Sequence, residues 1–195
     1  MQRSSVTNSA PYQPDRSLPG KISRRLTQWR AAAPATVSTD RPIVTMTFDD
    51  FPKSAAQIGA EIVESFDGRA GYYACTSFVG TANGMGEMFS EADLERLHTA
   101  GHEIGAHTHT HLDCARAKPE TARDDTDRNL IALSALGFHA PVTSFAFPYG
   151  EARYATKKDL AASFQTLRGV LPGLNVGRVD RAQLRAMELD HTDAS

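Results

Sequence analysis

Five short apolar runs alternate with helix-like segments, and this alternation is the feature that most restricts what the chain can fold into. The predicted strands cover residues 42–48, 71–75, 102–106, 142–147 and 165–170. Segments with helical spacing of apolar residues lie between them, over about 52–66, 90–100, 119–136 and 157–164. Strands that alternate with helices favour a parallel sheet, because each crossover helix packs back onto the sheet. We therefore predict an α/β fold, either an open doubly wound sheet or an incomplete barrel.

Apolar residues recur periodically in two of the predicted helices. The helix over 52–66 has Ile58, Ile62, Val63 and Phe66 at helical spacing, and we expect the helix over 119–136 to face Leu130, Ile131, Leu133 and Leu136 inward. Shorter helices are predicted over 21–32 and 181–187. Residues 1–20 are polar and contain three prolines, so we expect a flexible N-terminal arm there and a single domain over 21–195.

Composition excludes several classes of function. The net charge is −2 and the sequence pI is about 6.4, which does not indicate a nucleic-acid partner. Cys75 and Cys114 form no C-x-x-C motif and cannot make a disulfide framework, so we interpret both as small buried side chains. No apolar stretch is long enough for a membrane span. The first residues lack the apolar segment of a secretory signal, so a cytoplasmic location is expected, which a leader outside this sequence would change.

Two adjacent carboxylates follow the first predicted strand. The alternating run 44–48 ends at Asp49 and Asp50, which should deliver both side chains to the carboxyl edge of the sheet. Ionised carboxylates that lie side by side repel each other, so a cation or a proton is usually needed to hold them together. The alternative is a strand that ends in a solvated acidic turn.

Three histidines follow the third predicted strand in the pattern His107-x-His109-x-His111. If the chain turns into a helix there, His107 and His111 share one face and can bind one cation. If it stays extended, all three histidines share a face. Two imidazoles and one carboxylate form a ligand set that suits zinc, cobalt, nickel or ferrous iron and leaves positions open. A solvated histidine-rich turn is the alternative interpretation.

A cation at this edge would give the two carboxylates different roles. Asp50 can bind the metal, while Asp49 can accept the proton of a bound water whose pKa falls from about 15.7 to roughly 7. The backbone N–H of Tyr149, which follows Pro148 after the fourth predicted strand, is a candidate oxyanion donor. These roles predict hydrolysis of an amide or an ester.

The same residues carry a resemblance to a known family. Thr-Phe-Asp-Asp at 47–50, His-Thr-His-Thr-His at 107–111 after Gly-His-Glu-Ile-Gly-Ala, and Phe-Ala-Phe-Pro-Tyr-Gly at 145–150 stand in family order. The chain resembles polysaccharide deacetylases of the NodB-homology type, carbohydrate esterase family 4. The resemblance covers about residues 43–150 and continues more weakly to about 189.

The resemblance implies a distorted, incomplete (β/α) barrel. It implies one divalent metal ion, zinc before cobalt, nickel or ferrous iron, on Asp50, His107 and His111, with Asp49 as the base. It also implies that the substrates are N-acetylhexosamine-containing glycans or oligosaccharides and that acetate is released. His109 then falls at a variable position of the motif.

Two departures from the family pattern support other interpretations. Ala146 stands where the family has an arginine that braces the base. The family's late general-acid histidine has no clear counterpart, since His191 lacks a preceding apolar strand, and we expect the missing strand to lie beyond Ser195 or to be absent. The alternatives are therefore a catalytically impaired metal- or glycan-binding relative, or a hydrolase of other acyl amides or O-acetyl esters.

Overall fold

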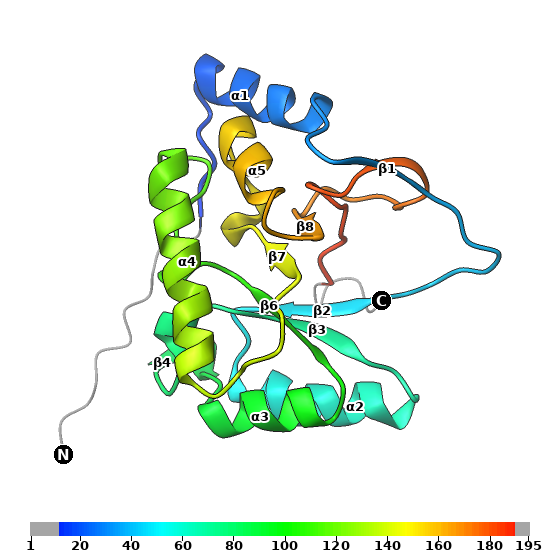
Figure 1. The fold of residues 1–195 in the computed structure, drawn as a ribbon, viewed down its shortest axis with the longest axis vertical. Helices are drawn as coiled ribbons and strands as arrows, with labels where there is room; N and C mark the ends of the chain where they lie inside the picture. Colours follow the sequence, from blue (N-terminus) through cyan, green and yellow to red (C-terminus); the bar gives the residue numbers. More distant parts are fainter. Residues whose placement is uncertain (1–11, 190–195) are drawn as a thin grey trace. The chain divides into compact units, whose positions relative to one another are not determined.

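The computed structural model describes residues 12–189, and these form two compact units. The described part of the first unit comprises residues 12–14, 44–111 and 126–142, and that of the second comprises residues 15–43, 112–125 and 143–189. Helices and strands are labelled as in Figure 1. Each unit is described separately below.

Parallel strands form the centre of the first unit. Strands β2 (Met46–Asp49), β3 (Ala70–Ala74) and β6 (Glu103–Ala106) pair in parallel in that order. All five residues of β3 are buried, as expected for a strand covered on both faces. In the second unit β7 (Ser144–Ala146) pairs in parallel with β8 (Thr166–Arg168). The five strands form one sheet in the order β2-β3-β6-β7-β8, which confirms the predicted α/β class with an incomplete (β/α) barrel.

The helices of the first unit lie along its strands in Figure 1. They are the π-helix η1 (Ala55–Gly59), which continues into α2 (Ala60–Ser65), and α3 (Glu91–Thr99). A capping box starts α3, because the Ser90 hydroxyl accepts from the Asp93 N–H and the Asp93 carboxylate accepts from the Ser90 N–H. The loop before α3 holds a short turn and a two-stranded ribbon, η2 (Thr76–Phe78), β4 (Ala82–Asn83) and β5 (Gly86–Glu87).

Aromatic side chains dominate the core of the first unit. The Phe51 ring stacks on Phe89 with centroids 4.1 Å apart and meets the edge of Tyr72 at 5.0 Å. The small side chains of Ala56 and Ala60 are buried with them. Of the apolar residues at helical spacing over 52–66, Ile58, Ile62 and Phe66 are exposed, whereas Val63 packs against the core. The alanine side of η1 and α2 enters the core, where small side chains allow close packing against bulky rings.

Helix α4 (Pro119–Ala135) buries a mostly polar stripe in place of the apolar one that we predicted. Ile131 is exposed, which corrects the expectation that it faces inward. The buried positions recur at helical spacing and are Ala122, Asp125, Thr126, Asn129 and Leu133. Buried polar side chains need hydrogen-bond partners, so this stripe is expected to bond to the elements that it packs against.

The second unit begins with helix α1 (Leu18–Trp29), three residues earlier than predicted. The Ser17 hydroxyl accepts from the Gly20 N–H at 3.2 Å and so caps the helix. Helix α1 packs beside α5 (Tyr154–Leu160) (Figure 1). Strand β1 (Pro34–Val37) follows α1 and pairs antiparallel with β9 (Gly177–Asp180).

The helix predicted over 181–187 is not formed. Its backbone pairs with β8: the Leu167 N–H donates to the Arg181 carbonyl, the Leu184 N–H donates to Leu167, and the Gly169 N–H donates to Leu184. Hydrogen bonds to a free strand edge therefore replace the helical ones, which the local sequence could not reveal.

Candidate metal centre

Strand β2 ends at the two carboxylates. Asp49 is its last residue and is half-buried, and Asp50 follows with a left-handed φ of 44°. A left-handed conformation costs about 1–2 kcal/mol for most residues, although aspartate tolerates it better than most. Strained residues of this kind concentrate at functional sites.

The histidine segment after β6 is neither of the two forms that the sequence left open. It is a loop in which Thr108 and His111 have φ values of 59° and 55°. These two reversals bring the rings of His107 and His111 together, with centroids 5.1 Å apart. The His109 ring has another partner, since its Nδ1 lies 2.8 Å from the Thr76 hydroxyl. The loop therefore separates His109 from the other two histidines.

Asp50, His107 and His111 meet in one cluster. Asp50 Oδ2 lies 2.6 Å from His111 Nε2 and 3.5 Å from His107 Nε2. One ligand atom from each of the three residues lies within 4.8 Å of the other two. Among residues 12–189, no other group of three histidine, cysteine or acidic residues is arranged in this way. The other carboxylate oxygen, Asp50 Oδ1, is buried without a hydrogen-bond partner. A buried unsatisfied acceptor beside two imidazoles fits a divalent cation.

The protonation state of Asp50 also suits a cation. Burial alone raises the pKa of this carboxyl, but hydrogen bonds from His107 and His111 outweigh burial and lower the pKa to about 2. The carboxylate is therefore ionised at neutral pH, which is the form that binds a metal.

Asn129, from the buried polar stripe of α4, joins the ends of two strands. Its side-chain carbonyl accepts from the His107 N–H at 3.4 Å, and its amide donates to the Ala74 carbonyl at 2.9 Å and to the Thr76 hydroxyl at 3.0 Å. Asn129 is fully buried. Sequence reasoning missed this residue, although Asp125, Thr126 and Asn129 at helical spacing in an otherwise plausible amphipathic helix were a signal of it.

Residues that follow strand β3 also contact the histidine loop. The His109 carbonyl accepts from the Ser77 N–H at 3.0 Å and from the Cys75 thiol at 3.2 Å. Burial raises the pKa of Cys75 to about 11, so the thiol stays protonated. The Phe78 ring stacks on His111 with centroids 6.0 Å apart. The loop is thus fixed at its first, middle and last histidine.

The remaining predicted site residues lie as follows. Asp49 adjoins the cluster in sequence, and its role as base stays a prediction. Tyr149 belongs to the second unit, in the short turn η3 (Pro148–Gly150), with a left-handed φ of 58°. Its role as oxyanion donor also stays a prediction. His191 lies outside the described residues.

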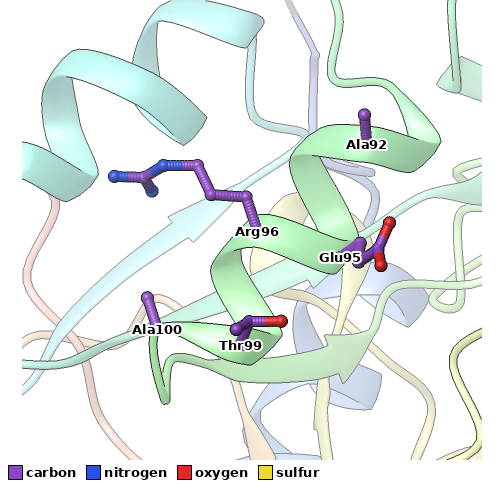
Figure 2. A pocket seen from close by; sticks show the side chains of 5 residues that line it. All are labelled: Ala92, Glu95, Arg96, Thr99 and Ala100. Carbon is purple, nitrogen blue, oxygen red and sulfur yellow. The ribbon is translucent and has the colours of Figure 1, made fainter.

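A shallow depression on the outer surface of α3 is not a competing site. Its five lining residues come from this one helix and its C-cap, as Figure 2 shows: Ala92, Glu95, Arg96, Thr99 and Ala100. Binding sites usually place polar groups from several elements around one point. The depression has the character of ordinary helix surface.

The fold and the cluster together define an α/β protein with a candidate metal centre at the ends of its parallel strands. The chain belongs to the polysaccharide deacetylase family: the profile of this family matches residues 36–166, about two thirds of the sequence. A search of curated proteins by sequence found no significant match.

Solved structures share this fold at low sequence identity. IcaB from Ammonifex degensii superposes with a TM-score of 0.71 and 18% identity over 80% of this chain and 72% of its own. The deacetylase PplD from Streptococcus pyogenes, solved in complex with acetate, gives 0.66 and 16% over 76% of this chain and 65% of its own. BA3943 from Bacillus anthracis, a pseudoenzyme of the CE4 family, gives 0.54 and 17% over 66% and 43%.

Proposed function

We propose that this protein is a metal-dependent deacetylase that removes the acetyl group from N-acetylhexosamine-containing glycans or oligosaccharides and releases acetate. Membership of the polysaccharide deacetylase family supports deacetylation of a carbohydrate. The observation that carries the metal-dependent part is the cluster of Asp50, His107 and His111 with its unpartnered carboxylate oxygen. The acetate in the PplD structure is the product that the proposal requires.

Asp50, His107 and His111 would hold the metal, for which we propose zinc. A bound divalent cation supplies Lewis-acid polarisation of a carbonyl and makes water a stronger acid. Asp50 is held ionised for this purpose, and the buried position of His107 keeps competing water away from its ring. Three protein ligands are typical of catalytic centres, because a fourth position stays open for water or substrate.

Asp49 is the proposed base. It would take a proton from the attacking water as the water oxygen bonds to the acetyl carbonyl carbon. The carbon–nitrogen bond then breaks, the amine leaves with a proton, and acetate is the other product. Asp50 is engaged by both histidines and is therefore assigned to the metal. The neighbouring carboxylate, Asp49, is assigned to proton transfer.

Two measurements on purified full-length protein test the proposal. Metal content after incubation with zinc should be about one equivalent per chain in the wild type and should be lost in His107→Ala, while the exposed His139→Ala control keeps it. Acetate release from N-acetylglucosamine oligomers should fall to background in Asp49→Asn while the metal stays bound. Acetate release by Asp49→Asn at the wild-type rate would refute the assigned base.

A catalytically impaired relative is the second candidate. Ala146 occupies the position of the family's arginine, and a CE4 pseudoenzyme is among the structures with this fold. This candidate predicts stoichiometric metal and glycan binding without acetate. Measuring metal and acetate on the same sample therefore separates the two candidates.

A further inference from the structure

The apolar side of helix α1 is exposed. Its four large apolar side chains recur at three- or four-residue spacing, so they form one stripe. All four are exposed, by 74, 65, 44 and 80% for Leu18, Ile22, Leu26 and Trp29. A surface helix normally packs such a stripe against its own core. We call these four residues the α1 stripe.

The polar side of α1 packs inward instead. Thr27 is 2% exposed, and Arg24 is engaged by the Asp15 carbonyl and by Glu151. The ammonium of buried Lys157 donates to the carbonyls of Thr27 and Arg30 at the end of the helix. These contacts fix the rotation of α1, so the outward direction of its stripe is built into the second unit.

Basic side chains outnumber acidic ones around the α1 stripe, where Asp15 precedes the helix and Glu151 pairs with Arg24. Residues 16–39 include no acidic side chain, and they include the basic residues Arg16, Lys21, Arg24, Arg25 and Arg30. Lys21 and Arg25 are exposed and stand one turn from members of the stripe. Long basic side chains beside an apolar stripe can extend their charges toward a surrounding anionic layer.

We propose that α1 docks the protein on an anionic lipid surface, with its axis in the plane of the membrane. Twelve residues give a helix about 18 Å long, and no helix in the described part of the chain is long and apolar enough to cross a membrane. An apolar stripe with tryptophan at one end and lysine and arginine beside it is the pattern of an interfacial helix. This inference does not depend on the metal centre.

A second copy of the chain fits the α1 stripe less well. A symmetric contact between two α1 helices would set Lys21 and Arg25 against their own counterparts, which repel. The exposed side of η1 and α2, with Ile58, Ile62 and the acidic Glu61, offers opposite charge. That contact would be head to tail, and it propagates into open chains unless the rotation closes a ring.

Trp29 provides a direct test, because it is the single tryptophan of the sequence. Its fluorescence is measured on the full chain with vesicles of phosphatidylcholine alone and with vesicles containing phosphatidylglycerol at about one lipid in four. We expect a blue shift and co-sedimentation with the anionic vesicles only, reversed when salt rises from about 0.1 to 1 M. No shift with either vesicle would overturn the proposal.

Matched variants locate the contact. Lys21→Gln and Arg25→Gln should each weaken binding to anionic vesicles about fivefold, and Ile22→Ser about tenfold. Ile62→Ser removes an equally exposed apolar residue with acidic neighbours and should bind as the wild type does. Self-association without lipid that is abolished by both Ile22→Ser and Ile62→Ser would assign the stripe to a second copy and refute lipid docking. Metal content should stay unchanged in all four variants.

Discussion

Two of the clusters of charged groups, the Lys157 cluster in the second unit and the Asp50 cluster in the first, differ in how completely their polar atoms are satisfied. In the second unit the ammonium of Lys157 contacts the Thr27 carbonyl, the Arg30 carbonyl at 2.8 Å, Asp180 at 2.9 Å and Gln183 at 3.1 Å. In the first unit Asp50 contacts two histidines, but its Oδ1 has no partner.

The backbone differs in the same way. Asp50, Thr108 and His111 around the first cluster all have left-handed φ values, whereas the residues of the Lys157 cluster do not. A buried ion pair with every polar atom satisfied acts as structure, because its desolvation is offset within the fold. A cluster that combines backbone strain with a buried unsatisfied acceptor fits a binding site for a cation. The two clusters therefore separate a structural ion pair from a candidate site without reference to the family.

The largest effect on stability should come from removing the ammonium of the Lys157 cluster. Lys157→Met leaves the Asp180 charge and two helix-end carbonyls buried without their donor, which should lower the free energy of unfolding by about 3–5 kcal/mol. Lys158→Met, at the exposed neighbouring position, is the control and should change it by less than about 0.5 kcal/mol. Urea unfolding measures both. A loss of under about 1 kcal/mol in Lys157→Met would contradict a structural role.

Adding metal should stabilise the folded protein through the cluster of Asp50, His107 and His111. Zinc at a hundred times its dissociation constant should raise the free energy of unfolding of the wild type by about 2.7 kcal/mol, because it binds the folded state. Thermal unfolding with and without a chelator checks this. His111→Ala should lose the increase and His109→Ala should keep it, since His109 is paired with Thr76. The reverse pattern would move the ligand set to His109.

Removing Asn129 should weaken metal binding at the cluster of Asp50, His107 and His111 without abolishing it. Asn129→Ala takes away the acceptor of the His107 N–H and should weaken metal affinity by about 10–100-fold. Titration with cobalt, read from its visible absorption, reports affinity and geometry together. Asp127→Ala, exposed on the same helix, is the control. An unaltered cobalt spectrum and affinity in Asn129→Ala would show that the asparagine only packs.

The smallest expected effect is the contribution of Asp180 to the loss of stability at low pH. Burial raises the pKa of Asp180, but Lys157 and the N–H groups of Ala33 and Ala32 outweigh burial and lower it below its ordinary value of 3.8. Because the folded-state pKa is the lower one, this carboxylate stabilises the fold above about pH 3.8, and the contribution is lost as pH falls through the folded pKa. Unfolding free energy measured from pH 5 to pH 2 should fall less steeply in Asp180→Asn than in the wild type. Equal slopes would exclude the contribution.

The sequence predicted those features that depend on short-range pattern. The order of strands and helices follows from local periodicity. Asp50, His107 and His111 could be assigned to strand ends, and parallel strands bring such ends to one edge. The left-handed loop that brings His107 and His111 together and sets His109 against Thr76 could not be predicted from local pattern, because it depends on partners such as Thr76 and Ser77 that lie far away in the chain.

Helix faces were harder to predict than helix positions. Periodicity finds an apolar stripe but does not say whether the fold covers it, and the α1 stripe is exposed, as are Ile58 of η1 and Ile62 of α2. In α4 the buried face is polar because Asn129 satisfies groups on two strands. The segment 181–187 pairs with β8, a non-local choice that overrides local helix propensity.

The Cys75 thiol beneath the histidine loop has a consequence for how the protein ages. A thiol with a pKa of about 11, fully buried and donating to the His109 carbonyl, has almost no thiolate at neutral pH. Peroxide and disulfide reagents attack the thiolate, so this sulfur resists oxidation. The loop that carries the histidines should therefore keep its geometry through prolonged exposure to air.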